Sequence, residues 1–563
     1  MKSDSDNIKI FISPINNKPT LILGFIEPVP LVLIIINIVF FLIRLQFLSV
    51  PFERDEGKYC FLGQLILDGK IPYKSFYEMK PPGLFFAYAF ITLLGGNSLE
   101  GVHLIFIFIN LITNLLLFQI GKKLMDSVSG IIISTSYSIL SLGPHISGFT
   151  VQAEQLVAFF VVCGVYYLFC ALENNKTSNY FLWGLSLGCS SLIKQTGIFF
   201  IFLSILYIFF YNYIGKKEKR KITIKNITSF FIGAFSLILL TILYLIYNDS
   251  LKEFIYWNFT FSSQYISTIT LEQGILNLTL FFKRIINNYK LFWFMSAVGI
   301  FLSFMKSVRY TEYKKIFLLL FLIISFLSII PGLRFYGHYW IVLIPSLSLL
   351  IGFSFYALKK ILNSEKNASH YPTGLYIFFI FMVVLNFYNL KDFYFNPDKV
   401  RLMRTVYGMN PFIESKQVAD FIKPMITKKE PVVVFGSEPE IYFYTQTRSP
   451  SVHSDIASLL TGFPKHRQFQ MEFIKEVELS KPRLMILFNN PFSLAVLPGT
   501  DTTVFSWFKN YSEKYYNLTG LVQLFPNKPT VYSWGENATQ NGLISDNFIV
   551  LYERRDEAIN EQP

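Results

Sequence analysis

The densest group of ionisable side chains in the first half of the chain lies between residues 51 and 83. It reads PFERDEGKYC at 51–60 and LDGKIPYKSFYEMKPPG at 67–83. Carboxylates beside ammonium groups suit a group-transfer reaction, because one group can take a proton while the other stabilises growing negative charge. The alternative is an interfacial loop whose charges are merely solvated. Pro81 and Pro82 with Gly83 favour an ordered loop, since they fix how the chain leaves it.

Further charged or polar residues interrupt apolar segments. Glu154 lies in GFTVQAEQLVAFF, Lys194 in SSLIKQTGIFF, and Arg334 in RFYGHYW, where His338 and Tyr339 follow it. A charge held among apolar residues is costly and therefore usually functional, which applies best to Lys194. Glu154 could instead cap a helix, and Arg334, like Lys80, could be an interfacial anchor.

Composition indicates a membrane protein. Of the 563 residues, 52% are hydrophobic, 18% aromatic and only 15% charged, which is too apolar for a soluble chain of this size. The net charge of +13 arises from Lys and Arg beside apolar runs. It therefore indicates topology and no nucleic acid partner. The four cysteines are too few and too scattered for a disulfide framework.

The apolar runs predict an all-α polytopic bundle. Crossing a hydrocarbon core of about 30 Å takes about twenty residues. Runs of that kind lie near 29–48, 99–120, 128–145, 151–172, 195–214, 227–247, 290–306, 315–331, 338–358 and 372–388, and one more begins at about 180 and turns into the next around Lys194. We expect about eleven transmembrane helices, plus juxtamembrane helices.

The basic loops predict the orientation of the bundle. The apolar piece at 84–96 is too short to cross, and a crossing there would put KKEKRK (216–221), KSVRYTEYKK (306–315) and KKILNSEK (359–366) outside. We therefore expect a juxtamembrane helix at 84–96 and a cytoplasmic amino terminus without a signal peptide. The predicted location is the plasma (inner) membrane, multi-pass, with outer loops at 49–98, 144–150, 249–289 and 332–337.

Composition changes to a soluble type after residue 388. Short β-branched runs at 431–436, 483–488 and 548–553 are typical of strands, and 416–425 shows helical spacing. The sequence predicts two domains: a transmembrane domain at 1–388 with a catalytic first outer loop at 49–98, and an extracytoplasmic α/β domain at 389–563.

The order of these motifs resembles a known family. A first span is followed by Arg-Asp-Glu-Gly-x-Tyr at 54–59, Gly-x-x-Pro-Tyr at 69–73 and Lys-Pro-Pro-Gly at 80–83, and then by the segments around Glu154, Lys194 and Arg334. This set is similar to the lipid-linked-sugar glycosyltransferases of the membrane C-type fold. The pattern most resembles the protein O-mannosyltransferases and the bacterial aminoarabinose transferases of lipid A. These enzymes form a superfamily of glycosyltransferases that resembles family 39.

The resemblance implies roles for individual residues. The resemblance implies that the acidic residue of the first outer loop is the catalytic base, and in this chain that residue is Asp55. With it we expect catalytic roles for Glu56 and Glu154; donor phosphate binding by Arg54, Lys80, Lys194 and Arg334; and contacts to the acceptor or sugar from Tyr59, Tyr77, His145, His338 and Tyr339.

The pattern departs from the family at one position. The aminoarabinose transferases carry a Glu directly before the motif lysine, and this chain has Met79 there, with Glu78 one residue earlier. This argues against a bound metal, so we assign no metal residue and no certain cofactor. Asp55 and Glu154 could still share a divalent cation or divide the acceptor and base roles.

The function expected from the resemblance is an inverting glycosyltransferase that moves a sugar from a polyprenyl-phosphate or pyrophosphate donor to an acceptor at the outer face. The acceptor, whether lipid, glycan or protein, is not encoded locally. A secondary transporter or lipid-linked glycan flippase is the main alternative, although repeated halves with broken helices are not visible. A scaffold whose outer domain binds partners is the third.

Overall fold

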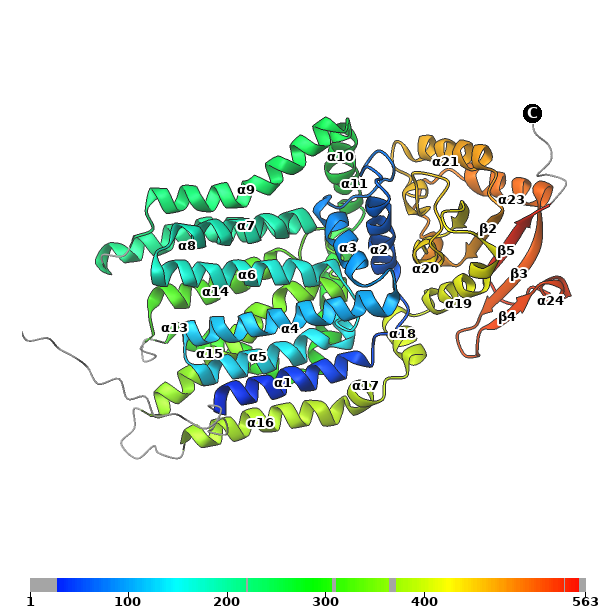
Figure 1. Cartoon of the computed structure of the whole chain (residues 1–563). Coiled ribbons are helices and arrows are strands. Elements are labelled where there is room, and N and C mark those ends of the chain that lie inside the picture. Colours follow the sequence, from blue (N-terminus) through cyan, green and yellow to red (C-terminus); the bar gives the residue numbers. More distant parts are fainter. Residues whose placement is uncertain (1–27, 219–220, 306–309, 364–370, 541, 556–563) are drawn as a thin grey trace, which may run out of the picture.

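The computed structural model describes residues 28–218, 221–305, 310–363, 371–540 and 542–555. A bundle of helices forms one part of the molecule and a five-stranded sheet with its own helices forms the other, with short helices between them (Figure 1). Parts of the predicted basic loops, at 219–220, 306–309 and 364–366, lie outside the described residues, as does the amino-terminal segment 1–27.

Each predicted apolar run forms a helix. The long helices run side by side along the bundle (Figure 1). They are α1 (Pro28–Leu45), α4 (Leu99–Leu124), α5 (Ser127–Leu142), α6 (Ala153–Asn174), α7 (Thr177–Ile193), α8 (Ile198–Glu218), α9 (Ile224–Tyr247), α13 (Lys290–Phe304), α14 (Glu312–Leu327), α15 (Ile344–Leu362) and α16 (Tyr371–Asn389). The helical bundle is therefore confirmed.

Length and composition select fewer helices as membrane spans. Among the described residues, five helices are long and apolar enough to cross a membrane, or six if the bent pair α12 (Leu271–Asn287) and α13 counts as one span. Several others, α1 and α5 among them, are apolar but shorter. The number of about eleven spans stays a prediction.

Two short helices lie at the end of the bundle nearest the sheet (Figure 1). Helix α2 (Arg54–Leu67) begins with a capping box in which Glu53 and Glu56 each accept a hydrogen bond from the other's backbone amide. Helix α3 (Gly83–Leu94) is the short apolar piece, and its twelve residues are too few to cross. The two helices pack closely because Gly63 of α2 lies directly against the backbone at Tyr88 and Ala89.

The segment predicted as an outer loop at 249–289 is largely helical. It contains α10 (Leu251–Ile255), a π-helix (Tyr256–Phe261), α11 (Ser262–Ile266) and α12. Helix α12 begins with a capping box between Thr270 and Gln273, and exposes Leu271 and Ile275. The prediction missed α12 because its apolar positions are spread over one face and form no continuous run.

The carboxyl-terminal part contains a mixed sheet in the order β1-β2-β5-β3-β4. Strands β1 (Val432–Phe435) and β2 (Leu484–Asn489) pair in parallel, and β5 (Asn547–Arg554), β3 (Tyr516–Leu524) and β4 (Val531–Trp534) join antiparallel. The strands predicted near 431, 483 and 548 are confirmed as β1, β2 and β5, whereas β3 and β4 were not predicted. The domain boundary at residue 388 stays a prediction.

The remaining helices surround this sheet and connect it to the bundle. They are α17 (Lys391–Phe395), α18 (Lys399–Tyr407), α19 (Phe412–Ile422), α20 (Glu440–Thr445), α21 (His466–Ser480), α22 (Pro491–Leu494), α23 (Thr503–Tyr515) and α24 (Glu536–Gln540). Helix α19 confirms the helix predicted near 416–425.

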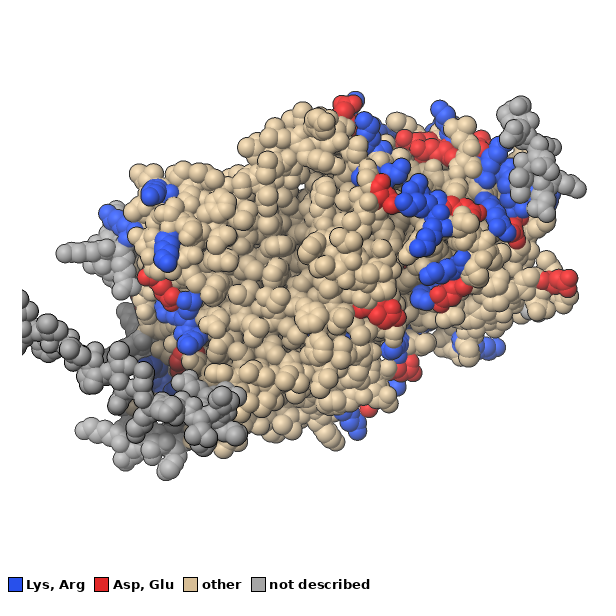
Figure 2. All heavy atoms as spheres, viewed as in Figure 1, with Lys and Arg blue, Asp and Glu red and all other residues tan. Residues whose placement is uncertain are grey.

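Charged side chains avoid the middle of the bundle surface. Figure 2 shows a broad uncharged belt over the helices, with Lys, Arg, Asp and Glu at the far end of the bundle and over the carboxyl-terminal part. This distribution suits a chain whose bundle lies in lipid.

Candidate active site

Helix α2 separates three consecutive charged residues. Arg54, Asp55 and Glu56 occupy its first turn. Because successive side chains on an α-helix point about 100° apart, the three lie on different faces and contact different parts of the molecule.

Glu56 is buried on the face toward the bundle. Its Oε2 atom accepts a hydrogen bond from the backbone amide of Val151 at 3.0 Å and lies 3.3 Å from Nε2 of His103. The neighbouring Glu53 accepts a hydrogen bond from the side-chain amide of Gln152 at 3.2 Å. These bonds fasten α2 to segment 148–152 and occupy the Glu56 carboxylate within the fold. A catalytic role for Glu56 stays a prediction.

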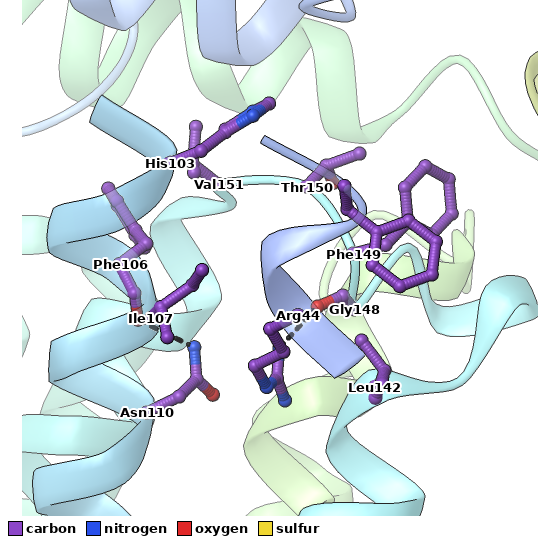
Figure 3. Close-up of a pocket in the computed structure, with 11 residues that line it drawn as sticks. Arg44, His103, Phe106, Ile107, Asn110, Leu142, Gly148, Phe149, Thr150 and Val151 are labelled. Atoms are coloured by element: carbon purple, nitrogen blue, oxygen red, sulfur yellow. Dashed lines mark hydrogen bonds between the residues drawn. The ribbon is translucent and has the colours of Figure 1, made fainter. Parts of the chain in front are cut away.

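The same segment is held from below by a buried arginine. Arg44 in the last turn of α1 donates hydrogen bonds to the carbonyl oxygen of Gly148 and to Oγ of Ser141, both at 3.0 Å. Figure 3 shows Arg44 reaching toward Gly148, with His103, Thr150 and Val151 around the same small cavity. Segment 148–152 leads directly into α6, so this network sets the position of Glu154.

Arg54 faces the carboxyl-terminal part. Its guanidinium donates hydrogen bonds to the carbonyl oxygens of Ser437 at 2.8 Å and Phe492 at 2.7 Å, and lies 3.9 Å from Oε1 of Glu438. The structure therefore does not bring Arg54 into direct contact with the other candidate phosphate-binding residues.

Asp55 is half-buried, and its carboxylate makes no hydrogen bond or ion pair with any residue that the structure describes. Its carboxylate nevertheless lies close enough to interact electrostatically with Lys194, His338 and Tyr339. Asp55 is thus the member of the Arg-Asp-Glu string that faces the predicted site.

Glu154 and Lys194 form a buried ion pair. The ammonium of Lys194 also lies 3.8 Å from the ring centroid of Tyr339, and Oε1 of Glu154 lies 4.0 Å from Nε2 of His338. Because a buried charge without a partner is very costly, the two charges depend on each other. Four residues predicted from three separate segments thus lie together.

Lys80 completes this cluster. Its ammonium makes no ion pair among the described residues, and its charge acts on Glu154, Lys194 and His338. The loop that carries it is fixed by a hydrogen bond from the Tyr73 hydroxyl to the Lys80 carbonyl oxygen. We refer to Asp55, Lys80, Glu154, Lys194, His338 and Tyr339 as the polar cluster.

Arg334 lies beside the polar cluster in a strained turn. Leu333 and Phe335 on either side of it have φ angles of 51° and 49°, a conformation that bulky residues rarely adopt and that recurs at functional sites. The guanidinium donates hydrogen bonds to Oγ1 of Thr268 at 2.9 Å and to the Tyr336 hydroxyl at 3.2 Å.

Tyr265 links this turn to Asp55. The guanidinium of Arg334 lies 4.0 Å from the ring centroid of Tyr265. Burial raises the pKa of Tyr265 to about 12, Arg334 lowers it, and Asp55 raises it. Arg334 therefore lies close to Asp55 through a single aromatic side chain.

The three remaining predicted contacts lie in different places. Tyr59 is buried against the ring of Tyr88, near the charges of Asp55 and Glu154. Tyr77 instead stacks on Trp257 with ring centroids 4.9 Å apart, and its backbone amide donates to the carbonyl oxygen of Val452.

His145 is half-buried, and its backbone packs against Gly337, the residue before His338: an added Cβ on Gly337 would lie 2.0 Å from the His145 carbonyl oxygen. Burial and the nearby charge of Arg284 lower its pKa. The structure therefore places Tyr59 next to the cluster and the backbone of His145 beside His338. Tyr77 lies elsewhere, against Trp257.

The sequence did not reveal a buried group of charges on α2. Lys58 pairs with Glu78 from the loop before Lys80 and with Asp455 from the carboxyl-terminal part, the latter at 2.6 Å between Nζ and Oδ2. Burial opposes the charged forms, but the two carboxylates raise the pKa of Lys58 and Lys58 lowers that of Asp455. Asp455 is remote in sequence, and no local pattern identifies it.

Helix α20 packs against α2 at a glycine. An added Cβ on Gly57 would lie 2.2 Å from Cβ of Glu440, so only glycine allows this approach. Burial raises the pKa of Glu438 to about 7 and that of Glu440 to about 8. Their carboxylates accept hydrogen bonds from the hydroxyls of Ser493 and Ser415.

No three His, Cys, Asp or Glu side chains gather as a metal-binding group in the described ranges.

Part of the chain matches a family model. Residues 79–246 match the model described as dolichyl-phosphate-mannose-protein mannosyltransferase. This range includes Lys80, Glu154 and Lys194. No curated protein sequence matches the chain significantly.

Solved structures of similar fold cover nearly the whole chain. ArnT from Cupriavidus metallidurans bound to undecaprenyl phosphate matches with a TM-score of 0.54 and 12% identity, over 93% of this chain and 97% of that chain. The apo oligosaccharyltransferase of Archaeoglobus fulgidus matches with a TM-score of 0.52 and 12% identity, over 90% and 74%. The same archaeal enzyme, AglB, in complex with an inhibitory peptide and a dolichol-phosphate gives the same four values.

These matches extend through both the bundle and the sheet, and the family model covers the segment that carries half of the polar cluster. The resemblance stated from the sequence is therefore confirmed: the chain is a membrane protein with the fold of the membrane C-type glycosyltransferases.

Proposed function

We propose that the chain is an inverting glycosyltransferase that moves a sugar from a polyprenyl-phosphate donor to an acceptor at the outer face of the plasma membrane. The observation that carries the proposal is the polar cluster, in which the Asp55 carboxylate has no direct partner among the described residues and lies within electrostatic reach of Lys194, the partner of Glu154.

Asp55 acts as the base. An acceptor hydroxyl or amine attacks the anomeric carbon of the donor sugar, and its proton passes to the Asp55 carboxylate. The bond between the anomeric carbon and the phosphate oxygen breaks, and the polyprenyl phosphate leaves with the bonding electrons. A carboxylate suits this role when it is within hydrogen-bond reach of the acceptor and not already occupied by the protein.

The cations stabilise the leaving phosphate. Lys80, Lys194 and Arg334 supply three positive charges, against two negative charges from Asp55 and Glu154. A donor phosphodiester brings one further negative charge, which balances the site. Of the three cations, Lys80 lacks an ion-pair partner among the described residues. We therefore assign the first contact with the phosphate to Lys80, with Arg334 beside it.

The lipid carriers of the similar structures support a donor of this class. ArnT was solved with undecaprenyl phosphate, and AglB with a dolichol-phosphate. Both are polyprenyl phosphates. A carrier whose tail stays in lipid also explains why the proposed site lies at the end of an apolar bundle (Figure 2).

The carboxyl-terminal part positions the catalytic helix in this proposal. Arg54, Gly57 and Lys58 of α2 all contact it. Because the amino terminus is cytoplasmic in this proposal, the carboxyl-terminal part lies outside the cytoplasm, on the same side as the acceptor.

Replacing Asp55 with Asn tests the proposal. In purified protein with a polyprenyl-phosphate sugar, Asp55→Asn should lower transfer by about 10²-fold or more, with normal abundance and unchanged donor binding. Asp392→Asn is the matched control, since Asp392 is exposed in α17. Transfer that is equal in Asp55→Asn and the control would refute Asp55 as the base.

Cells that lack the protein provide the second measurement. Mass spectrometry of their glycolipids and glycoproteins should reveal one acceptor class that loses a sugar, and Asp55→Asn should not restore it. Intact glycans with altered flux of a lipid-linked substrate would support transport instead.

A further inference from the structure

A second polar cavity lies at the end of the bundle remote from α2. It has a volume of about 540 Å³ and is lined by residues from the ends of five helices and the segment before α9: Lys123, Phe169, Leu172, Glu173, Asn175, Tyr180, Tyr211, Lys221, Ile222, Tyr313 and Lys314. This volume is typical of a small-molecule site. We refer to it as the basal cavity.

The basal cavity carries a positive charge. Lys123, Lys221 and Lys314 line it, and Glu173 is the one carboxylate among the lining residues. Lys123 pairs with Glu173, and Lys314 donates to the carbonyl oxygens of Lys123 and Leu124 at 2.8 and 2.9 Å. Lys221 is exposed at the rim. The lining therefore has an excess of cations, two of which are held in place by the surrounding helix ends.

The helix ends add further attraction for an anion. Tyr180 belongs to the first turns of α7, and Tyr313 and Lys314 to the first turn of α14. Neither helix has a side-chain cap at its amino terminus. The partial positive charge of such a terminus favours an anion nearby.

One wall of the basal cavity is apolar. Phe169 and Leu172 of α6 and Ile222 before α9 contribute to it. A free inorganic anion makes no favourable contact with such a wall, whereas the first carbons of the acyl chains of a lipid pack against it. The cavity is lined by helix ends at the end of the bundle opposite α2 (Figure 1). Charged side chains flank the uncharged belt at that end in Figure 2, as expected at the depth of lipid headgroups.

We propose that the basal cavity binds the phosphate-bearing headgroup of an anionic phospholipid from the leaflet at that end of the bundle. Basic pockets between transmembrane helices on the cytoplasmic side are suited to such headgroups. The site is remote from Asp55 (Figure 1), and the proposal does not depend on the glycosyltransferase reaction.

Native mass spectrometry of the delipidated full-length protein in a mild detergent tests this. The probes are phosphatidylglycerol, phosphatidylcholine with the same acyl chains, and glycerol 1-phosphate. We expect phosphatidylglycerol to be retained in preference to both others. Lys221→Gln should weaken its retention by about fivefold, because one cation is removed from the rim.

Glu173→Gln should act in the opposite direction and strengthen retention, since it removes the negative charge of the lining. A misfolded variant would not gain affinity, so this variant separates binding from folding. Lys360→Gln is the matched control, because Lys360 is an exposed lysine of the last turn of α15 that also lies over a tyrosine ring. It should leave retention unchanged.

Equal retention of phosphatidylglycerol and phosphatidylcholine would overturn the proposal. So would an equal loss in Lys221→Gln and Lys360→Gln, or weaker retention in Glu173→Gln. Retention of glycerol 1-phosphate as strong as that of the lipid would assign the basal cavity to a free phosphate compound and overturn the lipid assignment.

Discussion

Lys58 on α2 and Asp455 after β1 lie 2.6 Å apart between Nζ and Oδ2, although they come from opposite parts of the chain. Glu78, two residues before Lys80, pairs with the same ammonium. One buried lysine therefore joins the helix that carries Asp55, the loop that carries Lys80 and the carboxyl-terminal part.

Replacing Asp455 with Asn should loosen this junction. The variant removes one charged hydrogen bond of a buried group, which costs about 2 kcal/mol of unfolding free energy. Because Asp55 would shift with α2, transfer should fall by about tenfold or more. Thermal unfolding in detergent and initial transfer rates measure the two effects.

Asp420→Asn is the matched control for that variant. Asp420 pairs with Lys416 on the surface of α19, and such an exposed pair contributes about 0.5 kcal/mol at most. If both variants lose the same activity, the Lys58 junction does not position the site.

Replacing Lys80 with Gln should weaken donor binding. Its ammonium has no ion pair among the described residues, so its charge is available to the phosphate. Loss of a charge-assisted hydrogen bond of about 1.5–3 kcal/mol raises the KM for the donor roughly tenfold to hundredfold. Kinetics at varied donor concentration measure this.

Lys74→Gln provides the comparison, because Lys74 is exposed in the same loop. An unchanged donor KM in Lys80→Gln, or an equal rise in both variants, would contradict the proposed role.

Glu154 and Lys194 should be strongly coupled. Breaking a buried ion pair by neutralising one partner costs about 3–5 kcal/mol, since a charge is left unpaired. Glu154→Gln and Lys194→Met should each destabilise the protein more than the double variant does. A double-mutant cycle in thermal unfolding measures the coupling. Additive losses would mean that the contact contributes no coupling energy.

The sequence predicts the helices well because their cause is local. An apolar run of about twenty residues must form helix in lipid, since its backbone has no other hydrogen-bond partners there. A search for continuous apolar runs does not detect helix α12, because its apolar residues cover one face only. Strands β3 and β4 escape it too, because their pairing depends on residues far away in sequence.

The site was predictable in part for the same reason. The motif around residues 54–56 identifies the right helix start, but a helix points neighbouring side chains in different directions. Asp55 faces the polar cluster, whereas Arg54 faces the carboxyl-terminal part and Glu56 faces segment 148–152. Only the packing of α2 reveals which of the three is available for chemistry.

Stability should depend on pH through Glu438 and Glu440. Burial raises the pKa of Glu438 from 4.5 to about 7 and that of Glu440 from 4.5 to about 8. Between pH 4.5 and these raised values, the folded protein therefore holds more protons than the unfolded chain. Their contribution to stability is therefore complete below about pH 4.5 and is lost as the pH rises through 7 and 8. Melting temperatures across this range should decline.

The double variant Glu438→Gln with Glu440→Gln isolates this effect. Its neutral amides do not titrate, so its melting temperature should decline less between pH 5 and pH 8 than that of the unaltered protein. Parallel profiles for the two proteins would assign the pH dependence to other groups.

Gly57→Ala tests whether the close packing of α2 on α20 is needed for activity. The new Cβ would lie 2.2 Å from Cβ of Glu440 and 2.7 Å from its Cα, so one helix must move. Overpacking of this kind costs about 1–3 kcal/mol, and a shift of α2 displaces Asp55 relative to Lys194. We expect a lower melting temperature and slower transfer with an unchanged acceptor preference.

Gly374→Ala is the control, because nothing lies near its added Cβ. If Gly57→Ala transfers sugar as fast as the control does, α2 tolerates displacement and the contact with α20 does not set the geometry of the site.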